Sequence, residues 1–170
     1  SAQSIPRLCE MDQFGVPMGI STNGTSINEK NAEKLASLKN LIHINVSIDS
    51  PDPNVYRSIR GGELEKALSG VKKLLDAFQE KDKEKITISS VLLKDGIGSL
   101  SSFPRILRKI GAKKWVLQST IDNTLHSRMD GLAESDKARN EIANIREAAL
   151  KEGVNLEYTL PSRISLELQD

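Results

Sequence analysis

The stretch Gly19-Ile20-Ser21-Thr22-Asn23-Gly24-Thr25 carries a short apolar strand directly into small polar residues and a glycine. A second stretch, Asn45-Val46-Ser47-Ile48-Asp49-Ser50, ends in the same way. Parallel α/β sheets keep their ligand groups at the carboxyl ends of the strands. The two stretches therefore predict an α/β fold with a ligand site at one edge of a parallel sheet.

Composition sets the class of protein. A chain of 170 residues with 38% hydrophobic and 28% charged residues is typical of one globular domain with a real core, so we expect a single domain over residues 1–170. The net charge of +1 and the 4% of aromatic residues argue against nucleic acid as a partner. No apolar run approaches the roughly 20 residues that span a bilayer, so we expect no membrane segment. The single cysteine, Cys9, excludes an intrachain disulfide and predicts a cytoplasmic protein.

The hydrophobic pattern alternates between strands and helices, which favours βαβ units around a parallel sheet. The predicted strands are Val16–Ser21, His43–Asp49, Lys85–Leu93, Lys114–Ser119 and Val154–Leu160. The predicted helices are Ile5–Phe14, Glu29–Leu38, Glu63–Gln79, Ser99–Ile110 and Glu134–Glu152. Apolar runs such as Ile86–Leu93 indicate strands that are covered on both faces.

Three groups of residues are candidates for binding a ligand. Thr22, Asn23 and Gly24 either approach a ligand or form an ordinary turn after the strand. Ser47 and Asp49 lie two apart, so a continued strand places them on one face, where they suit a ribose or an amine; alternatively, Asp49 begins a turn.

Arg60 precedes two glycines and suits a carboxylate, or else it is an ordinary surface arginine. In the second half of the chain, strand ends contribute Lys94, Asp95, Gln118 and Ser119 as site candidates, although isolated residues at such positions are more often solvated strand ends.

Four motifs in register between about Gly15 and Gln118 resemble radical S-adenosylmethionine (SAM) enzymes of the cofactor-maturation and peptide-modifying type. The motifs are the strand that ends in Thr22-Asn23-Gly24, the strand Val46-Ser47-Ile48-Asp49, the segment Asp52-Pro53-Asn54-Val55-Tyr56-Arg57-Ser58-Ile59-Arg60-Gly61, and the later strands Ile86–Leu93 and Lys114–Gln118. The resemblance implies a parallel-stranded partial (β/α) barrel. It also implies an oxidoreductase in which a 4Fe–4S cluster reduces SAM to methionine and a 5′-deoxyadenosyl radical.

The resemblance also assigns cofactor-binding residues. It places Thr22 and Asn23 near SAM, Ser47 and Asp49 near its ribose or methionine portion, and Arg60 near its carboxylate. The remaining assignments are Val91 and Leu92 beside the adenine and Gln118 at the end of the following strand.

The chain departs from the family at its start. The chain contains no Cys-x3-Cys-x2-Cys motif, and no Gly-Gly-Glu motif stands ahead of the strand Val16–Ser21, so the chain holds no metal ligands of this kind and no catalytic residue is assigned. We expect a fragment that begins after the second strand of the barrel, or a degenerate relative, and in either case no SAM cleavage by this chain alone. A missing neighbour would leave the Val16–Ser21 strand with an open edge through which the chain could associate.

Three functions remain open from the sequence. The first is the central and C-terminal part of a radical SAM oxidoreductase, with a small molecule or a peptide as its substrate. The second is a nucleotide-binding α/β module without a cluster. The third is an unrelated parallel α/β isomerase or aldolase that uses Lys94 or Asp49.

Overall fold

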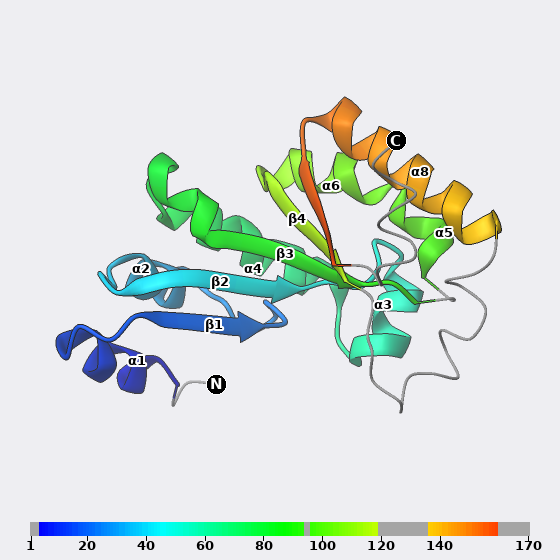
Figure 1. Cartoon of the computed structure of the whole chain (residues 1–170). Helices are drawn as coiled ribbons and strands as arrows, with labels where there is room; N and C mark the ends of the chain where they lie inside the picture. Colours follow the sequence, from blue (N-terminus) through cyan, green and yellow to red (C-terminus); the bar gives the residue numbers. More distant parts are fainter. Residues whose placement is uncertain (1–3, 94–95, 119–135, 160–170) are drawn as a thin grey trace.

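The computed structural model describes residues 4–93, 96–118 and 136–159. Within these residues the five predicted strands are all present, and they form one parallel sheet in the order β1-β2-β3-β4-β5 (Figure 1). The strands are β1 Met18–Thr22, β2 Leu41–Ser47, β3 Ile86–Val91, β4 Lys114–Gln118 and β5 Asn155–Thr159. Among the described strands β1 pairs with β2 alone, so it forms the open edge that the sequence predicts. Association through this edge stays a prediction.

Helices connect the strands and cover one face of the sheet (Figure 1). The elements are α1 Ser4–Gln13, α2 Glu29–Ala36, α3 Pro53–Arg60, α4 Leu64–Ala77, the 3-10 helix η1 Glu80–Lys85, α5 Ile97–Leu100, α6 Phe103–Ile110 and α8 Asp136–Glu152. Asn28 caps α2 by accepting a hydrogen bond from the backbone N–H of Asn31 at 2.8 Å. Gly111 ends α6 with a positive φ of 87°, a conformation that glycine adopts without strain.

The helices differ from the prediction in two places. The segment Pro53–Arg60 forms α3, a helix that is absent from the predicted set. Its signal was present: the Asp52 carboxylate accepts hydrogen bonds from Asn54 and Val55, and Pro53 stands in the first turn. The predicted helix Ser99–Ile110 is divided into α5 and α6, and Pro104 stands in the first turn of the second.

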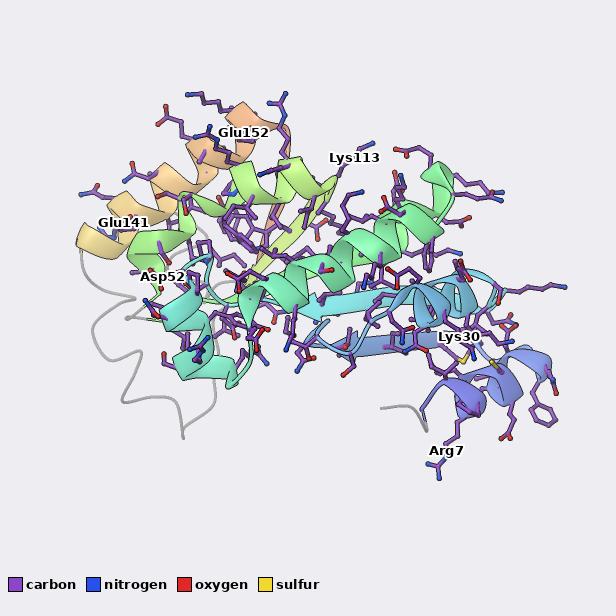
Figure 2. All side chains as sticks on the ribbon, turned by 180° about the vertical axis from the view of Figure 1, so that it is seen from behind. Arg7, Lys30, Asp52, Lys113, Glu141 and Glu152 are labelled. Atoms are coloured by element: carbon purple, nitrogen blue, oxygen red, sulfur yellow. The ribbon has the colours of Figure 1, made fainter. Side chains whose placement is uncertain are left out.

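The hydrophobic core lies between the sheet and these helices. Ile44, Ile88 and Trp115 belong to three neighbouring strands, and all three are fully buried in this core. The ring of Phe103, on α6, meets Trp115 edge to face with a centroid distance of 5.3 Å. Viewed from the helix side, Asp52 lies at the start of α3, and Lys113 and Glu152 lie near the opposite ends of the strands (Figure 2).

In the part of the chain that the structure describes, no helix is long and apolar enough to cross a membrane. A single domain over residues 1–170 and a cytoplasmic location stay predictions.

Candidate functional site

The carboxyl ends of β1 to β4 meet at one edge of the sheet and bring most of the predicted site residues together. Thr22 ends β1, Ser47 ends β2, Val91 ends β3 and Gln118 ends β4. Neighbouring ends are in register, with Ser47 beside Ser89 and Val91 beside Gln118. The backbone N–H of Leu92 donates to the carbonyl of Gln118 at 2.8 Å, which continues the pairing past the strand end.

The face of the sheet opposite the described helices carries polar side chains. Strand alternation places Ser21, Asn45 and Thr87 in one row across three strands, and Ser47 beside Ser89 in the next row. The Ser47 and Ser89 hydroxyls lie 3.5 Å apart. The buried Thr87 Oγ1 has no hydrogen-bond partner among the described residues. Such a face suits a polar ligand better than a packed helix.

The polar face was not predicted from the sequence. The run Ile86–Leu93 was interpreted as continuously apolar, whereas Thr87 and Ser89 alternate there with Ile86 and Ile88. All four residues are buried, so burial on both faces was predicted correctly, but the polar character of one face was not. The signal was the period of two in Ile86-Thr87-Ile88-Ser89.

Asp49 lies just beyond β2 and is 1% exposed. Its Oδ1 accepts a hydrogen bond from the backbone N–H of Val91 at 2.9 Å. Its Oδ2 forms an ion pair with Nε of Arg60, at the end of α3. The carboxylate therefore joins the end of β2 to the end of β3 and to α3.

Arg60 is partly exposed, and its hydrogen bond to Asp49 raises the pKa of its guanidinium above the ordinary value. Tyr56, one turn earlier on α3, is fully buried, and its hydroxyl has no partner among the described residues. Burial raises the pKa of this hydroxyl, so it stays protonated at neutral pH. The end of α3 thus carries the Arg60 guanidinium close to the Tyr56 hydroxyl, which has no partner among the described residues.

The turn after β1 is held by its own side chains and by α4. Thr22 Oγ1 accepts from the backbone N–H of Gly24 at 3.1 Å, and Asn23 Oδ1 accepts from the backbone N–H of Thr25 at 3.2 Å. Gly24 has a positive φ of 79°. A Cβ built on Gly70, in α4, would lie 2.0 Å from the Gly24 carbonyl oxygen, so only glycine fits at that position. Thr22 and Asn23 therefore have the roles of turn residues, and the amide nitrogen of the exposed Asn23 side chain is available to a ligand.

The remaining candidates differ in their exposure. Gln118 is exposed at the end of β4 and belongs to the same edge, whereas the Leu92 side chain is buried in the hydrophobic core. Lys94, Asp95 and Ser119 lie outside the described residues.

The residues of this chain do not fit an iron–sulfur cluster, which is held by several cysteine thiolates. Cys9 is the one cysteine of the sequence, and it lies on α1, partly buried against the core. Among the described residues no group of three His, Cys, Asp or Glu side chains could hold a metal ion.

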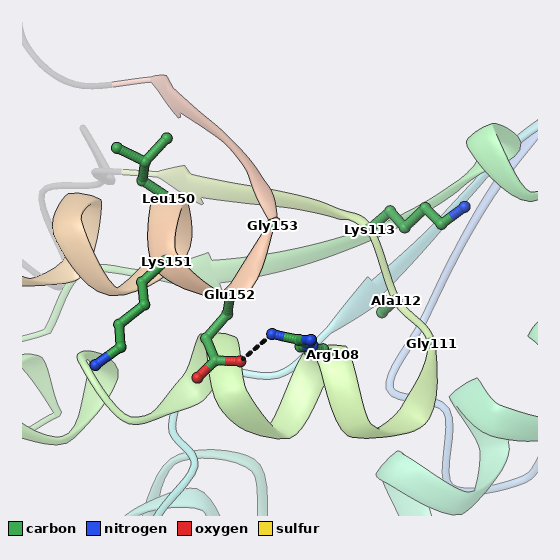
Figure 3. A pocket seen from close by; sticks show the side chains of 8 residues that line it. All are labelled: Arg108, Gly111, Ala112, Lys113, Leu150, Lys151, Glu152 and Gly153. Carbon is green, nitrogen blue, oxygen red and sulfur yellow. Dashed lines mark hydrogen bonds and ion pairs between the residues drawn. The ribbon is translucent and has the colours of Figure 1, made fainter.

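A pocket lies at the opposite edge of the sheet, at the amino ends of β4 and β5. Its lining comes from the last turns of α6 and α8 and from the residues just before β4 and β5, and Arg108 pairs there with Glu152 at 3.2 Å (Figure 3). Leu150 on its rim is 82% exposed. The pocket contains none of the predicted site residues.

Comparison with known proteins gives a family match over the site-bearing half of the chain. The model of the radical SAM superfamily matches residues 3–95. A probable GTP 3′,8-cyclase of Methanococcus aeolicus is 28% identical over 154 residues, which are 85% of this chain and 50% of that protein. A second probable GTP 3′,8-cyclase, of Methanocaldococcus jannaschii, is 26% identical over 160 residues, again 85% of this chain and 50% of that protein. The chain thus spans about half the length of the curated relatives that it matches.

Solved structures agree on the fold. Streptococcus suis SuiB bound to the precursor peptide SuiA superposes with a TM-score of 0.71 at 13% identity, over 97% of this chain and 37% of SuiB. SuiB bound to SAM superposes with a TM-score of 0.66 at 14% identity, over 91% of this chain and 33% of SuiB. The predicted parallel-stranded partial (β/α) barrel is thereby confirmed.

Proposed function

Since the chain belongs to the radical SAM superfamily, we propose that the carboxyl edge of β1 to β4 forms the SAM-binding part of a radical SAM oxidoreductase. The observation that carries the proposal is the position of the family match. Residues 3–95 include β1, β2, α3 and β3, the elements that bring Asn23, Ser47, Asp49 and Arg60 to one edge. A ligand at this edge would also meet the polar face of the sheet, which none of the described helices covers.

The proposal gives each side chain at the edge a role. The Asn23 amide and the Ser47 hydroxyl suit the hydroxyl and amino groups of SAM, because both side chains offer hydrogen-bond donors and acceptors. The guanidinium of Arg60 keeps its two terminal nitrogens for the SAM carboxylate while Nε binds Asp49. Thr22 lies near SAM through its turn, Val91 flanks the adenine, and Gln118 closes the site at the end of β4. The side chain of Leu92 is buried in the core, so this residue would contribute only its backbone.

Proteins of this superfamily use SAM together with a 4Fe–4S cluster, which supplies the electron for SAM cleavage. With one cysteine, this chain does not supply the cluster ligands, so we expect it to be inactive alone. Its residues bind and orient SAM and exclude competing reactions. We propose that SAM is cleaved by a longer parent protein that contains this part.

The substrate is proposed at the level of class. The curated relatives are named as probable GTP 3′,8-cyclases, and SuiB was solved with a precursor peptide. We propose a small polar molecule or a peptide that lies against the row Ser21, Asn45 and Thr87. Neither nucleic acid nor a membrane is a proposed partner.

The test uses the protein from the complete reading frame that contains this chain, reconstituted anaerobically with iron and sulfide. Dithionite-dependent formation of 5′-deoxyadenosine from SAM supports the proposal. A protein that binds neither iron nor SAM contradicts it and favours a module without a cluster.

Arg60→Ala sharpens the test. Removing one partner of a charged contact costs about 2 kcal/mol or more, so the affinity for SAM should fall roughly 30-fold. Arg57→Ala is the matched control, because Arg57 is exposed on the same helix. An unchanged SAM affinity of the Arg60 variant would remove the carboxylate assignment.

A further inference from the structure

Both oxygens of the Asp49 carboxylate are already engaged within the protein. Oδ1 accepts the Val91 backbone N–H, and Oδ2 accepts Nε of Arg60. Asp49 itself is buried, whereas the Arg60 side chain is 33% exposed. Of Asp49 and Arg60, only the arginine side chain can touch a molecule at the surface.

Neighbouring elements enclose Asp49. A Cβ built on Gly96 would lie 3.6 Å from the Asp49 backbone carbonyl oxygen, an ordinary van der Waals distance, so Gly96 packs against the backbone of this residue. Tyr56, from α3, and Arg60 are ionisable groups that interact electrostatically with Asp49. A buried carboxylate in such a position is tolerated because a cation and a backbone N–H satisfy both of its oxygens.

The arrangement fixes the direction of the guanidinium. A carboxylate that binds Nε holds the plane of the arginine fork, so the edge formed by the two terminal nitrogens has a fixed direction in which it can meet a second carboxylate. The same carboxylate holds the amide of Val91, so it sets the position of the β3 end relative to α3. Both partners are residues to which the proposed function assigns SAM contacts.

We propose that Asp49 is a positioning residue, which acts on the cofactor only through Arg60 and the β3 end and does not bind the SAM ribose or amine itself. The inference rests on the proposed function for the identity of the cofactor. It rests on the structure alone for the link between Asp49 and Arg60.

A double-mutant cycle in the reconstituted full-length protein separates positioning from direct binding. We expect Asp49→Asn to weaken SAM binding about 10-fold and Arg60→Gln about 30-fold. Because Asp49 acts through Arg60, the double variant should bind within about 2-fold of Arg60→Gln alone. Independent effects, which multiply to about 300-fold, overturn the proposal. Asp76→Asn, a change of the exposed carboxylate that pairs with Lys72, is the matched control and should leave the affinity unchanged.

A second measurement does not depend on SAM. In ¹H–¹⁵N spectra of this chain, Asp49→Asn should shift the Arg60 Nε–H resonance and speed its exchange with water, while Asp76→Asn should not. The Asn amide oxygen can still accept the Val91 N–H, so the fold should survive the change. An unmoved Arg60 resonance in a folded Asp49→Asn variant overturns the positioning role. If the wild-type protein does not bind SAM, the proposed function is overturned instead. The Arg60 resonance would still decide whether Asp49 holds the arginine.

Discussion

The two ends of the sheet use charge in opposite ways. At the carboxyl end, the buried Asp49 pairs with Arg60, and the buried Ser50 and Ser90 hydroxyls each have partners. At the amino end, Glu80 pairs with Lys83 and Lys113, and its own carboxylate is exposed. A buried polar group must keep its partner, because water cannot replace it, whereas an exposed ion pair exchanges freely with solvent. Geometry is therefore fixed at the carboxyl end, where the proposed cofactor site lies, and left adjustable at the amino end.

The largest effect should come from the backbone contact that fixes the turn after β1. Gly70→Ala puts a methyl group 2.0 Å from the Gly24 carbonyl oxygen, so helix α4 and the turn cannot both keep their positions. Ala favours a helix over Gly by about 1 kcal/mol, but overpacking against backbone outweighs that gain. We expect a net loss of about 2 kcal/mol or more in the free energy of unfolding, measured by urea denaturation.

Gly98→Ala is the control for this change. Gly98 lies in α5, and among the described residues no neighbouring element comes within 4 Å of the position that a methyl group on this residue would take. Its substitution should therefore be neutral or stabilising. Equal stability of the Gly70 and Gly98 variants would show that the turn after β1 adjusts easily and would break the contrast between the two ends.

A buried hydroxyl that joins three strands should give the next effect. Ser90 accepts a hydrogen bond from Trp115 Nε1 at 2.9 Å and donates to the Ile48 carbonyl. Ser90→Ala leaves both groups buried without this partner, so we expect a loss of about 1–3 kcal/mol in unfolding free energy. Ser102→Ala removes a similar hydrogen bond, to the Ser99 carbonyl, from an exposed residue and should have little effect. If the two variants lose the same stability, burial is not what distinguishes the carboxyl end.

The cap of α3 should matter less for stability and more for the site. Asp52→Ala removes the acceptor of the Asn54 and Val55 N–H groups, at a cost of about 1 kcal/mol. Asn28→Ala removes the equivalent cap of α2 and should cost a similar amount. Only the first helix carries Arg60, so only Asp52→Ala should also weaken SAM binding by the full-length protein. Equal SAM affinities in the two variants would show that fraying of α3 does not reach Arg60.

The contrast between the ends also explains what could be predicted from the sequence. Strands β1 to β5 follow from local hydrophobic pattern, because burial in a parallel sheet needs only apolar residues at the right period. Helix α3 was missed because Pro51-Asp52-Pro53 suggested a turn, although an Asp before a Pro is also a helix start.

The site was harder to predict than the fold. Thr22, Ser47 and Gln118 were located from their position near strand ends and Val91 from the family resemblance, and the structure brings the ends of these strands together. The pairing of Asp49 with Arg60 joins residues 11 positions apart through the start of α3, and no local pattern shows it. The approach of Gly70 to Gly24 was missed for the same reason, because a glycine within a helix indicates close packing without naming what packs there.

The smallest expected effect tests the amino end. Hydrogen bonds from Lys113 and Lys83 hold the pKa of the Glu80 carboxyl at about 2, below its ordinary 4.5. A carboxyl whose pKa is lower in the folded state adds stability above about pH 4.5, and this stability is lost as the pH falls toward about 2. The ¹³C resonance of the Glu80 carboxyl should therefore titrate near pH 2 at low salt. Lys113→Ala should move the midpoint up toward 4.5, whereas Lys114→Ala, which removes the partner of Glu157, should not.

High salt separates the exposed ion pair of Glu80 from the buried partner of Arg60. Because Glu80 is exposed, 1 M NaCl, with a Debye length of about 3 Å, should raise its midpoint. The Arg60 Nε–H resonance should stay where it is, because the Asp49 partner is buried and salt screens such a pair much less. The opposite result would be an Arg60 resonance that moves with salt and a Glu80 midpoint that does not. It would show that the amino end of the sheet, and not the carboxyl end, has the fixed geometry.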